Sequence, residues 1–239
     1  MASWMVHLRV AQAVATQFPS LCTREFIVGN IAPDSGVPNK DWSAFEPSTD
    51  ISHFKSKNAQ GERVVEPQRF VDKYLTPVQS AAYTPTQRAF YLGYWCHLLT
   101  DVLWVRDIVA TSITADADAY HRDPSAAIWK WKKDWYDLDF LYLRDHPDFE
   151  AFAVYAQATD IENIWMEEFS RDAFALRCAY ITAFYRSEEE HGVLDRDYPY
   201  LTKARMDAFV RDAAEQICRR MTTFLPEVHK DFAPNTPKD

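Results

Sequence analysis

Apolar residues recur every three or four positions along most of the chain, which is the spacing of helices that pack on a core. This pattern predicts helices at residues 4–18, 67–82, 90–109, 125–144, 148–157, 161–168, 170–187 and 203–224. An apolar run at 25–28 leads into a turn-rich segment, 29–38, and no periodicity follows before residue 67.

The pattern predicts an all-α fold in a single domain that spans residues 1–239. We expect a multi-helix bundle in which the long irregular loop lies over a buried central helix, because loops of that length are more often functional than idle. The tail from about residue 226 is expected to be frayed.

The predicted central helix, Phe90 to Val109, is apolar on almost every side, yet His97 and Asp101 lie in its middle. Side chains four residues apart on a helix lie about 40° apart and one turn above each other, so both face the same way. A carboxylate in such a place must be paired, hydrogen-bonded or bound to a metal. The pair is therefore either a structural hydrogen bond or two ligands of one cation.

Three further polar residues could join this pair. His7 lies on the apolar stripe of the first predicted helix, Asp34 in the turn-rich segment and His53 in the irregular loop. Individually, each has an ordinary explanation, since a histidine can be a core residue and an aspartate a turn residue. Together with His97 and Asp101 they form a set of imidazole and oxygen ligands that suits zinc or a similar divalent ion.

Composition allows a large core and restricts the partners. The chain has 239 residues, of which 47% are hydrophobic, and its net charge is −9. That charge argues against a stable complex with nucleic acid or with an anionic membrane. It does not exclude a phosphate substrate, because bound cations reverse the local field.

The cysteines and the N-terminal residues are typical of a cytoplasmic protein. Cys22, Cys96, Cys178 and Cys218 are far apart and form no CxxC motif, so we expect reduced thiols. The first twenty residues lack a basic region followed by an unbroken apolar run, so we expect no secretory signal. The central helix is too short and carries too many ionisable residues to be a transmembrane segment.

The candidate ligands follow one another in a characteristic order. His7 on a first helix precedes Asp34 in GNIAPDSG, then His53, then His97 and Asp101 in GYWCHLLTD. Over roughly the first half of the chain, this order resembles the zinc-dependent phospholipase C family, which is related to the S1/P1 nucleases, and in particular a bacterial branch of uncertain substrate. The resemblance implies that His53 and His97 bind one zinc ion with both aspartates, and that Asp101 bridges to a second zinc held by His7.

The chain departs from the family pattern in two places. Secreted relatives begin with a tryptophan whose amino group is a ligand, whereas the first tryptophan here is Trp4. Relatives also carry a histidine six residues after the HxxxD aspartate and an HxxxE pair on the next helix. This chain has Asp107 and His121 at those places, with Ser125 instead of the glutamate. Asp107 and His121 are therefore only minor candidates for a third metal site.

These residues predict a zinc-dependent hydrolase that acts on a small soluble phosphoester, a phosphodiester or a phosphomonoester, through a metal-activated water. The cofactor is expected to be one or two zinc ions or another divalent metal. Asp34 is the candidate catalytic residue, which would orient or deprotonate the water. Trp42, Tyr94 and Trp104 either line the pocket or pack in the core.

Two alternatives to this function remain open. The first is a non-catalytic helical module whose metal site is structural or degenerate. The second is a helical metal-dependent phosphohydrolase of the HD type. It is disfavoured because the chain contains no His-Asp dipeptide.

Overall fold

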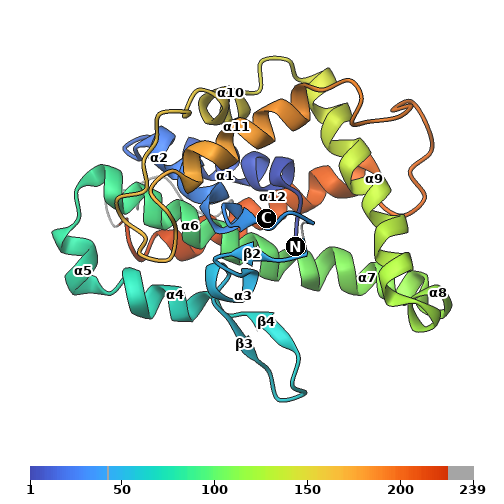
Figure 1. Ribbon diagram of the computed structural model, residues 1–239, viewed down its shortest axis with the longest axis horizontal. Coiled ribbons are helices and arrows are strands. Elements are labelled where there is room, and N and C mark those ends of the chain that lie inside the picture. The colour runs from blue at the N-terminus through green and yellow to red at the C-terminus, as the bar shows by residue number, and fades with distance from the viewer. Residues whose placement is uncertain (42, 226–239) are drawn as a thin grey trace, which may run out of the picture.

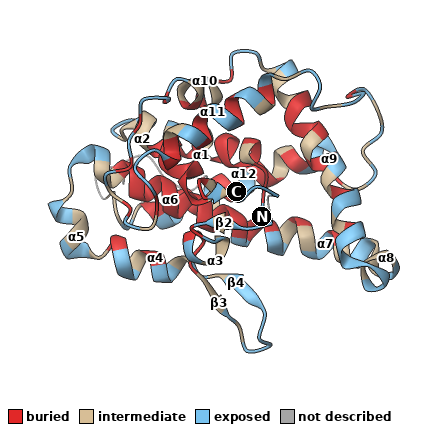
Figure 2. Cartoon of the chain, viewed as in Figure 1, coloured by how far each residue is buried: buried red, intermediate tan, exposed pale blue. Residues whose placement is uncertain are grey.

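Helix α6 (Pro85–Trp104) is the buried centre of the fold, as its apolar pattern predicts. In the computed structural model, which describes residues 1–41 and 43–225, α6 packs against α1 (Trp4–Gln17), α2 (Thr23–Ile31), α4 (Pro67–Tyr74) and α12 (Lys203–Met221). Figure 1 shows α1, α2, α6 and α12 grouped in the middle of the molecule. Figure 2 shows that buried residues are concentrated on these four helices.

The other elements surround this group. The remaining α-helices are α3 (Thr49–Ser52), α5 (Pro77–Ala82), α7 (Ala110–Ala115), α8 (Ala117–Arg122), α9 (Pro124–Asp145), α10 (Glu150–Ala156) and α11 (Ala173–Arg186). A 3-10 turn, η1 (Ala32–Asp34), follows α2, and a π-helical turn, η2 (Val105–Val109), follows α6. Strands β1 (Val37–Pro38) and β2 (Phe45–Glu46) form one antiparallel ribbon, and β3 (Lys55–Lys57) and β4 (Arg63–Val65) form another. The predicted all-α class is confirmed.

Two predicted helices are wrong, each for a local reason. Residues 67–82 form two helices, because Pro77 begins a new one that the Thr76 side chain caps. Residues 161–168 are not helical. There, Nδ2 of Asn163 donates to the backbone oxygens of Met166 at 2.6 Å and Phe169 at 2.8 Å, and this local bonding replaces the helical pattern.

The turn-rich segment begins later than predicted, because Gly29 is part of α2. A Cβ on Gly29 would lie 2.1 Å from the backbone oxygen of Phe90, and one on Gly93 would lie 2.1 Å from that of Phe26. The backbones of α2 and α6 therefore cross in direct contact, which only glycine allows at both positions. The crossing brings Asn30 next to α6.

The irregular segment between η1 and α4 covers α6, as expected, and contains α3 and both ribbons. The Tyr94 hydroxyl of α6 donates to the backbone oxygen of Ser52 at 2.5 Å. Phe54 packs edge-on against Phe70 and Tyr94. These contacts fix the loop at His53, the residue between Ser52 and Phe54.

All four cysteines are free thiols, and three of them are buried. Within residues 1–41 and 43–225, every helix is too short or too polar to cross a lipid bilayer. The predictions for Trp42 and for the tail from about residue 226 lie outside the described residues.

Candidate metal centre

The five residues proposed as metal ligands converge on one point beside the middle of α6. They come from four parts of the chain: His7 from α1, Asp34 from η1, His53 from the end of α3, and His97 and Asp101 from α6. All are buried except Asp34, whose side chain is 14% exposed. Sequence spacing places only His97 and Asp101 together, so the tertiary fold assembles the other three.

The distances show one compact cluster. Asp101 Oδ2 lies 3.6 Å from Nε2 of both His53 and His97, and Asp101 Oδ1 lies 3.4 Å from Nε2 of His7. Nε2 of His53 lies 3.3 Å from Asp34 Oδ1 and 3.2 Å from Nε2 of His97. These atoms form two overlapping sets that could each hold an ion, and His97 belongs to both. Asp101 turns one oxygen toward each set.

Unsatisfied polar atoms indicate that the cluster could hold a cation. Both ring nitrogens of His7 and Oδ2 of Asp101 are buried and lack a hydrogen-bond partner among the described residues. Leaving such a group unpaired costs about 1–3 kcal/mol, so folded proteins rarely do so without a ligand or water. Imidazole nitrogens and carboxylate oxygens around one point fit a zinc-like ion in donor type and number.

Hydrogen bonds outside the cluster orient its rings. Nδ1 of His97 donates to the backbone oxygen of Asn30 at 2.7 Å, so its Nε2 faces the cluster with a free lone pair. Nδ1 of His53 lies 2.9 Å from the Ser52 hydroxyl, and its Nε2 also faces inward. Such outer contacts are the usual means by which proteins fix the tautomer of a metal-binding histidine.

The protonation states suit metal binding. Burial, reinforced by the neighbouring His97, lowers the pKa of His7 to about 4, so its imidazole is neutral at pH 7. The two rings stack in parallel with their centres 3.7 Å apart. Burial alone would raise the pKa of Asp101, but the nearby imidazoles of His7 and His97 hold it well below its usual range. Likewise, the hydrogen bond with His53 outweighs burial and lowers the pKa of Asp34.

His97 balances this negative charge. Although burial opposes its protonation, the nearby carboxylates of Asp101 and Asp34 raise the pKa of His97. A proton on His97 and a metal ion in the cluster therefore compete for the same place. Metal affinity is expected to fall as the pH falls.

Two residues at the cluster were not identified from the sequence. Asn30 fixes the His97 tautomer through its backbone, and no pattern distinguishes it from other turn-forming residues. The backbone N–H of Ala2 donates to Asp101 Oδ1 at 2.8 Å. Ala2 lies there because α1 begins beside the cluster. The side chain of an alanine gives no indication of such a role in the sequence.

The two minor candidates for a third metal site do not join the cluster. Asp107 lies at the surface on η2, where its carboxylate accepts two hydrogen bonds of 2.6 Å from Arg106. His121 is exposed on α8. Neither belongs to a metal-binding group among the described residues. The structure therefore gives no support to a third site built from this pair.

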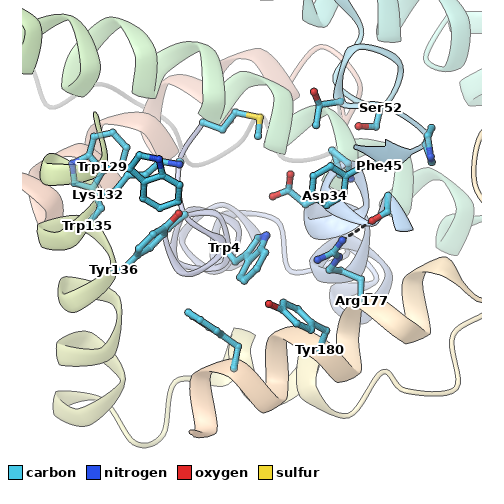
Figure 3. Close-up of a pocket in the computed structure, with 18 residues that line it drawn as sticks. Trp4, Asp34, Phe45, Ser52, Trp129, Lys132, Trp135, Tyr136, Arg177 and Tyr180 are labelled. Atoms are coloured by element: carbon cyan, nitrogen blue, oxygen red, sulfur yellow. Dashed lines mark hydrogen bonds between the residues drawn. The ribbon is translucent and has the colours of Figure 1, made fainter. Parts of the chain in front are cut away.

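A cavity of about 470 Å³ opens beside Asp34. Figure 3 shows Asp34 and Arg177 on one side of it, and Trp129, Lys132 and Tyr136 from α9 on the other. Of the five candidate ligands, Asp34 lines this cavity. Tyr94 and Trp104, considered as pocket walls, are fully buried core residues instead.

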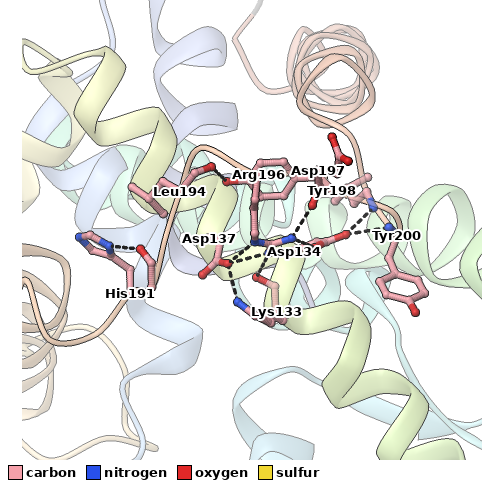
Figure 4. Close-up of polar contacts among 11 residues, drawn as sticks. Lys133, Asp134, Asp137, His191, Leu194, Arg196, Asp197, Tyr198 and Tyr200 are labelled. Atoms are coloured by element: carbon pink, nitrogen blue, oxygen red, sulfur yellow. Dashed lines mark hydrogen bonds and ion pairs between the residues drawn. The ribbon is translucent and has the colours of Figure 1, made fainter.

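Another buried polar cluster has a structural role. Arg196 pairs with Asp134 at 2.8 Å and with Asp137 at 2.6 Å (Figure 4). Asp134 Oδ2 also accepts the backbone N–H groups of Tyr200 at 2.7 Å and Leu201 at 3.2 Å. These bonds attach the segment before α12 to α9 and satisfy the charges within the protein.

Asp139, a buried carboxylate on α9 that contacts the start of α1, makes the stability of the protein depend on pH. Asp139 accepts hydrogen bonds of 2.8 Å from the hydroxyls of Ser3 and Tyr185, and burial raises its pKa to about 7. Because the folded pKa exceeds the unfolded value of about 4, stability is lost as the pH rises between about 4 and about 7, by up to about 1.4 kcal/mol per pH unit. Asp139→Asn should remove this loss.

Urea unfolding at several pH values measures the effect. The free energy of unfolding of Asp139→Asn, minus that of the wild type, should increase with pH across this window. The same difference for Asp118→Asn, an exposed aspartate on α8, serves as the control. A flat difference for Asp139→Asn would contradict the assignment.

No protein-family model, curated protein or solved structure matches the chain. The chemistry of the cluster and of the cavity beside it is therefore the basis for proposing a function.

Proposed function

We propose that the protein is a metal-dependent hydrolase that acts on a phosphoester through a metal-activated water. The observation that carries this proposal is the convergence of three histidines and two aspartates, with unpaired buried atoms, at the edge of a cavity. The order of these residues along the chain, which resembles the zinc-dependent phospholipase C family, supports it. A buried structural hydrogen bond would explain His97 and Asp101, but not the other three.

In this proposal the residues divide into two roles. His7, His53, His97 and Asp101 hold one or two divalent ions, and imidazole with carboxylate oxygen favours zinc. A bound divalent ion supplies hydroxide at neutral pH, since it lowers the pKa of water from about 16 toward about 7. Asp34 contacts both the cluster and the cavity, so it is placed to orient or deprotonate the attacking water.

The N-terminal residues bear on the second ion. The nitrogen of Ala2 already lies within hydrogen-bond distance of Asp101 Oδ1, on the side of the cluster that holds His7. In a chain that begins at Ala2, this nitrogen would be a free amine and could act as the ligand that the phospholipase C family takes from its terminal tryptophan. Mass spectrometry of the intact purified protein would show whether Met1 is retained.

The substrate is proposed to be a small soluble phosphoester in the cytoplasm. The net charge of −9 opposes a stable complex with nucleic acid, whose backbone would be repelled. The cavity of about 470 Å³ has the size of a pocket for a small molecule.

Metal analysis and an activity screen test this function. Protein purified without chelators should contain zinc or another divalent metal, and should hydrolyse p-nitrophenyl phosphate or bis-p-nitrophenyl phosphate. Removal of the metal with EDTA should abolish the activity, and added zinc should restore it. Protein that neither contains a metal nor binds added zinc would refute the proposal.

A second function is favoured by the deep burial of the cluster. Four of the five proposed ligands are at most 1% exposed, as is typical of a closed structural site rather than an open catalytic one. A helical module with a structural metal would unfold at lower temperature after EDTA treatment and would show no hydrolysis. Activity that depends on the metal would exclude this alternative.

A further inference from the structure

Arg177 is a buried cation with no carboxylate partner in the part of the chain that the structure describes. Its side chain on α11 is 5% exposed, and one NH2 group donates to the backbone oxygen of Gly36 at 2.6 Å. Its Nε lacks a hydrogen-bond partner among the described residues. The guanidinium carbon of Arg177 also lies 5.9 Å from the centre of the Trp4 ring and 5.5 Å from that of the Tyr180 ring, as in cation–π contacts.

Such an arrangement is unusual for a purely structural arginine. A buried guanidinium is costly unless a charge or several acceptors satisfy its donors, and contacts with aromatic rings offset only part of that cost. Arg196, which is 22% exposed, shows a guanidinium whose charge is satisfied, since two aspartates accept from it. Arg177 lines the cavity, so a molecule bound there could supply the negative charge that the described residues do not.

A second cation lines the same cavity from the opposite side. Lys132 on α9 lies 4.6 Å from the ring of Trp129 and forms no ion pair with any described residue. Burial lowers the pKa of Lys132, as expected for an ammonium group that lacks a counter-charge. Asp34, whose carboxylate faces His53 at 3.3 Å, is the carboxylate among the described lining residues. The cavity is therefore locally positive in a chain with a net charge of −9.

Much of the remaining cavity wall is aromatic. Trp4, Trp129 and Tyr136 surround the space between the two cations, and Tyr180 and Phe184 close it along α11. Aromatic walls with a few cations at fixed positions favour a ligand that combines a flat or aliphatic apolar group with an anion.

We propose that Arg177 binds an oxyanion of the molecule that occupies this cavity, while the aromatic walls hold the apolar group attached to it. The ligand class is an organic phosphate or carboxylate. If the ligand is the substrate, the inference rests on the proposed function. It then states that the phosphoryl group of the phosphoester lies between Arg177 and the candidate metal ligands. The binding itself requires no hydrolysis.

Calorimetry with non-hydrolysable probes tests this proposal on the full chain. The probes are phenylphosphonate, which has a ring and an oxyanion, benzyl alcohol, which lacks the charge, and inorganic phosphate, which lacks the ring. The wild type should bind phenylphosphonate at least tenfold more tightly than either of the others. Benzoate, as a fourth probe, shows whether a carboxylate also satisfies Arg177. Equal affinity for phenylphosphonate and benzyl alcohol would overturn the proposal without any variant.

Substitution then assigns the binding to Arg177. Arg177→Met should weaken phenylphosphonate binding at least tenfold and leave benzyl alcohol binding unchanged, whereas Arg177→Lys should retain part of the affinity because it keeps the charge. Arg171→Met is the matched control, since Arg171 is exposed and pairs with Glu162. Wild-type affinity of a folded Arg177→Met for phenylphosphonate would overturn the proposal.

The two proposals can fail separately. Binding of phenylphosphonate that depends on Arg177, in a protein that hydrolyses no phosphoester, would support the anion site and refute the hydrolase. Metal-dependent hydrolysis of phenyl phosphate with the same kcat/KM in wild type and Arg177→Met would support the hydrolase and overturn the anion site.

Discussion

Replacement of His97 by alanine is expected to lower the metal affinity of the cluster more than about 100-fold, which exceeds the usual effect of losing an outer-shell contact. His97 belongs to both ligand sets, so its loss damages both ion positions, whereas loss of His7 or His53 damages one. If the cluster is catalytic, hydrolysis should fall at least in proportion. Metal analysis after gel filtration and isothermal titration with zinc measure the effect.

His146→Ala is the matched control for this substitution. His146 follows α9 and bonds to the backbone oxygen of Tyr142 outside the cluster, so its removal should leave the metal content unchanged. Circular dichroism must show that His97→Ala keeps its helices, because the change also leaves the backbone oxygen of Asn30 without its donor. A folded His97→Ala protein with the zinc affinity of the wild type would show that the cluster is not the binding site.

Replacement of Gly93 by alanine is expected to destabilise the protein by more than about 3 kcal/mol, at or beyond the upper end of the usual cost of overpacking. The added Cβ would lie 2.1 Å from the backbone oxygen of Phe26. Neither partner is a flexible side chain, so α2 and α6 would have to separate. Since their crossing also places Asn30 beside His97, a surviving protein should bind metal more weakly.

Chemical denaturation of Gly93→Ala and Gly192→Ala gives the comparison. Gly192 lies in an exposed segment, and a Cβ there meets nothing within 4 Å. The alanine at that position should leave stability unchanged or increase it by up to about 1 kcal/mol, because it restricts the unfolded chain. A Gly93→Ala protein with stability within 1 kcal/mol of the wild type would refute the direct contact between the two helices.

The candidate ligands could be found from the sequence because ionisable residues stand out on apolar stripes. His7 and His97 lie on the buried faces of two helices, and Asp101 follows His97 by one turn. Asp34 and His53 are indicated by the long irregular loop that carries them and by the order of the five residues along the chain. The structure brings all five together, and it leaves Asp107 and His121 outside.

The sequence alone determined the positions of most helices and the burial of α6. It also determined which ionisable residues are buried in or near α6. These properties follow from local periodicity and from the cost of burying charge, both of which can be read along the chain. The direct contact between α2 and α6, the positions of Ala2 and Asn30 at the cluster, and the unpaired cation Arg177 beside the cavity were decided by the tertiary structure. Each depends on backbone groups or on residues distant in sequence, and such groups leave no periodic signal.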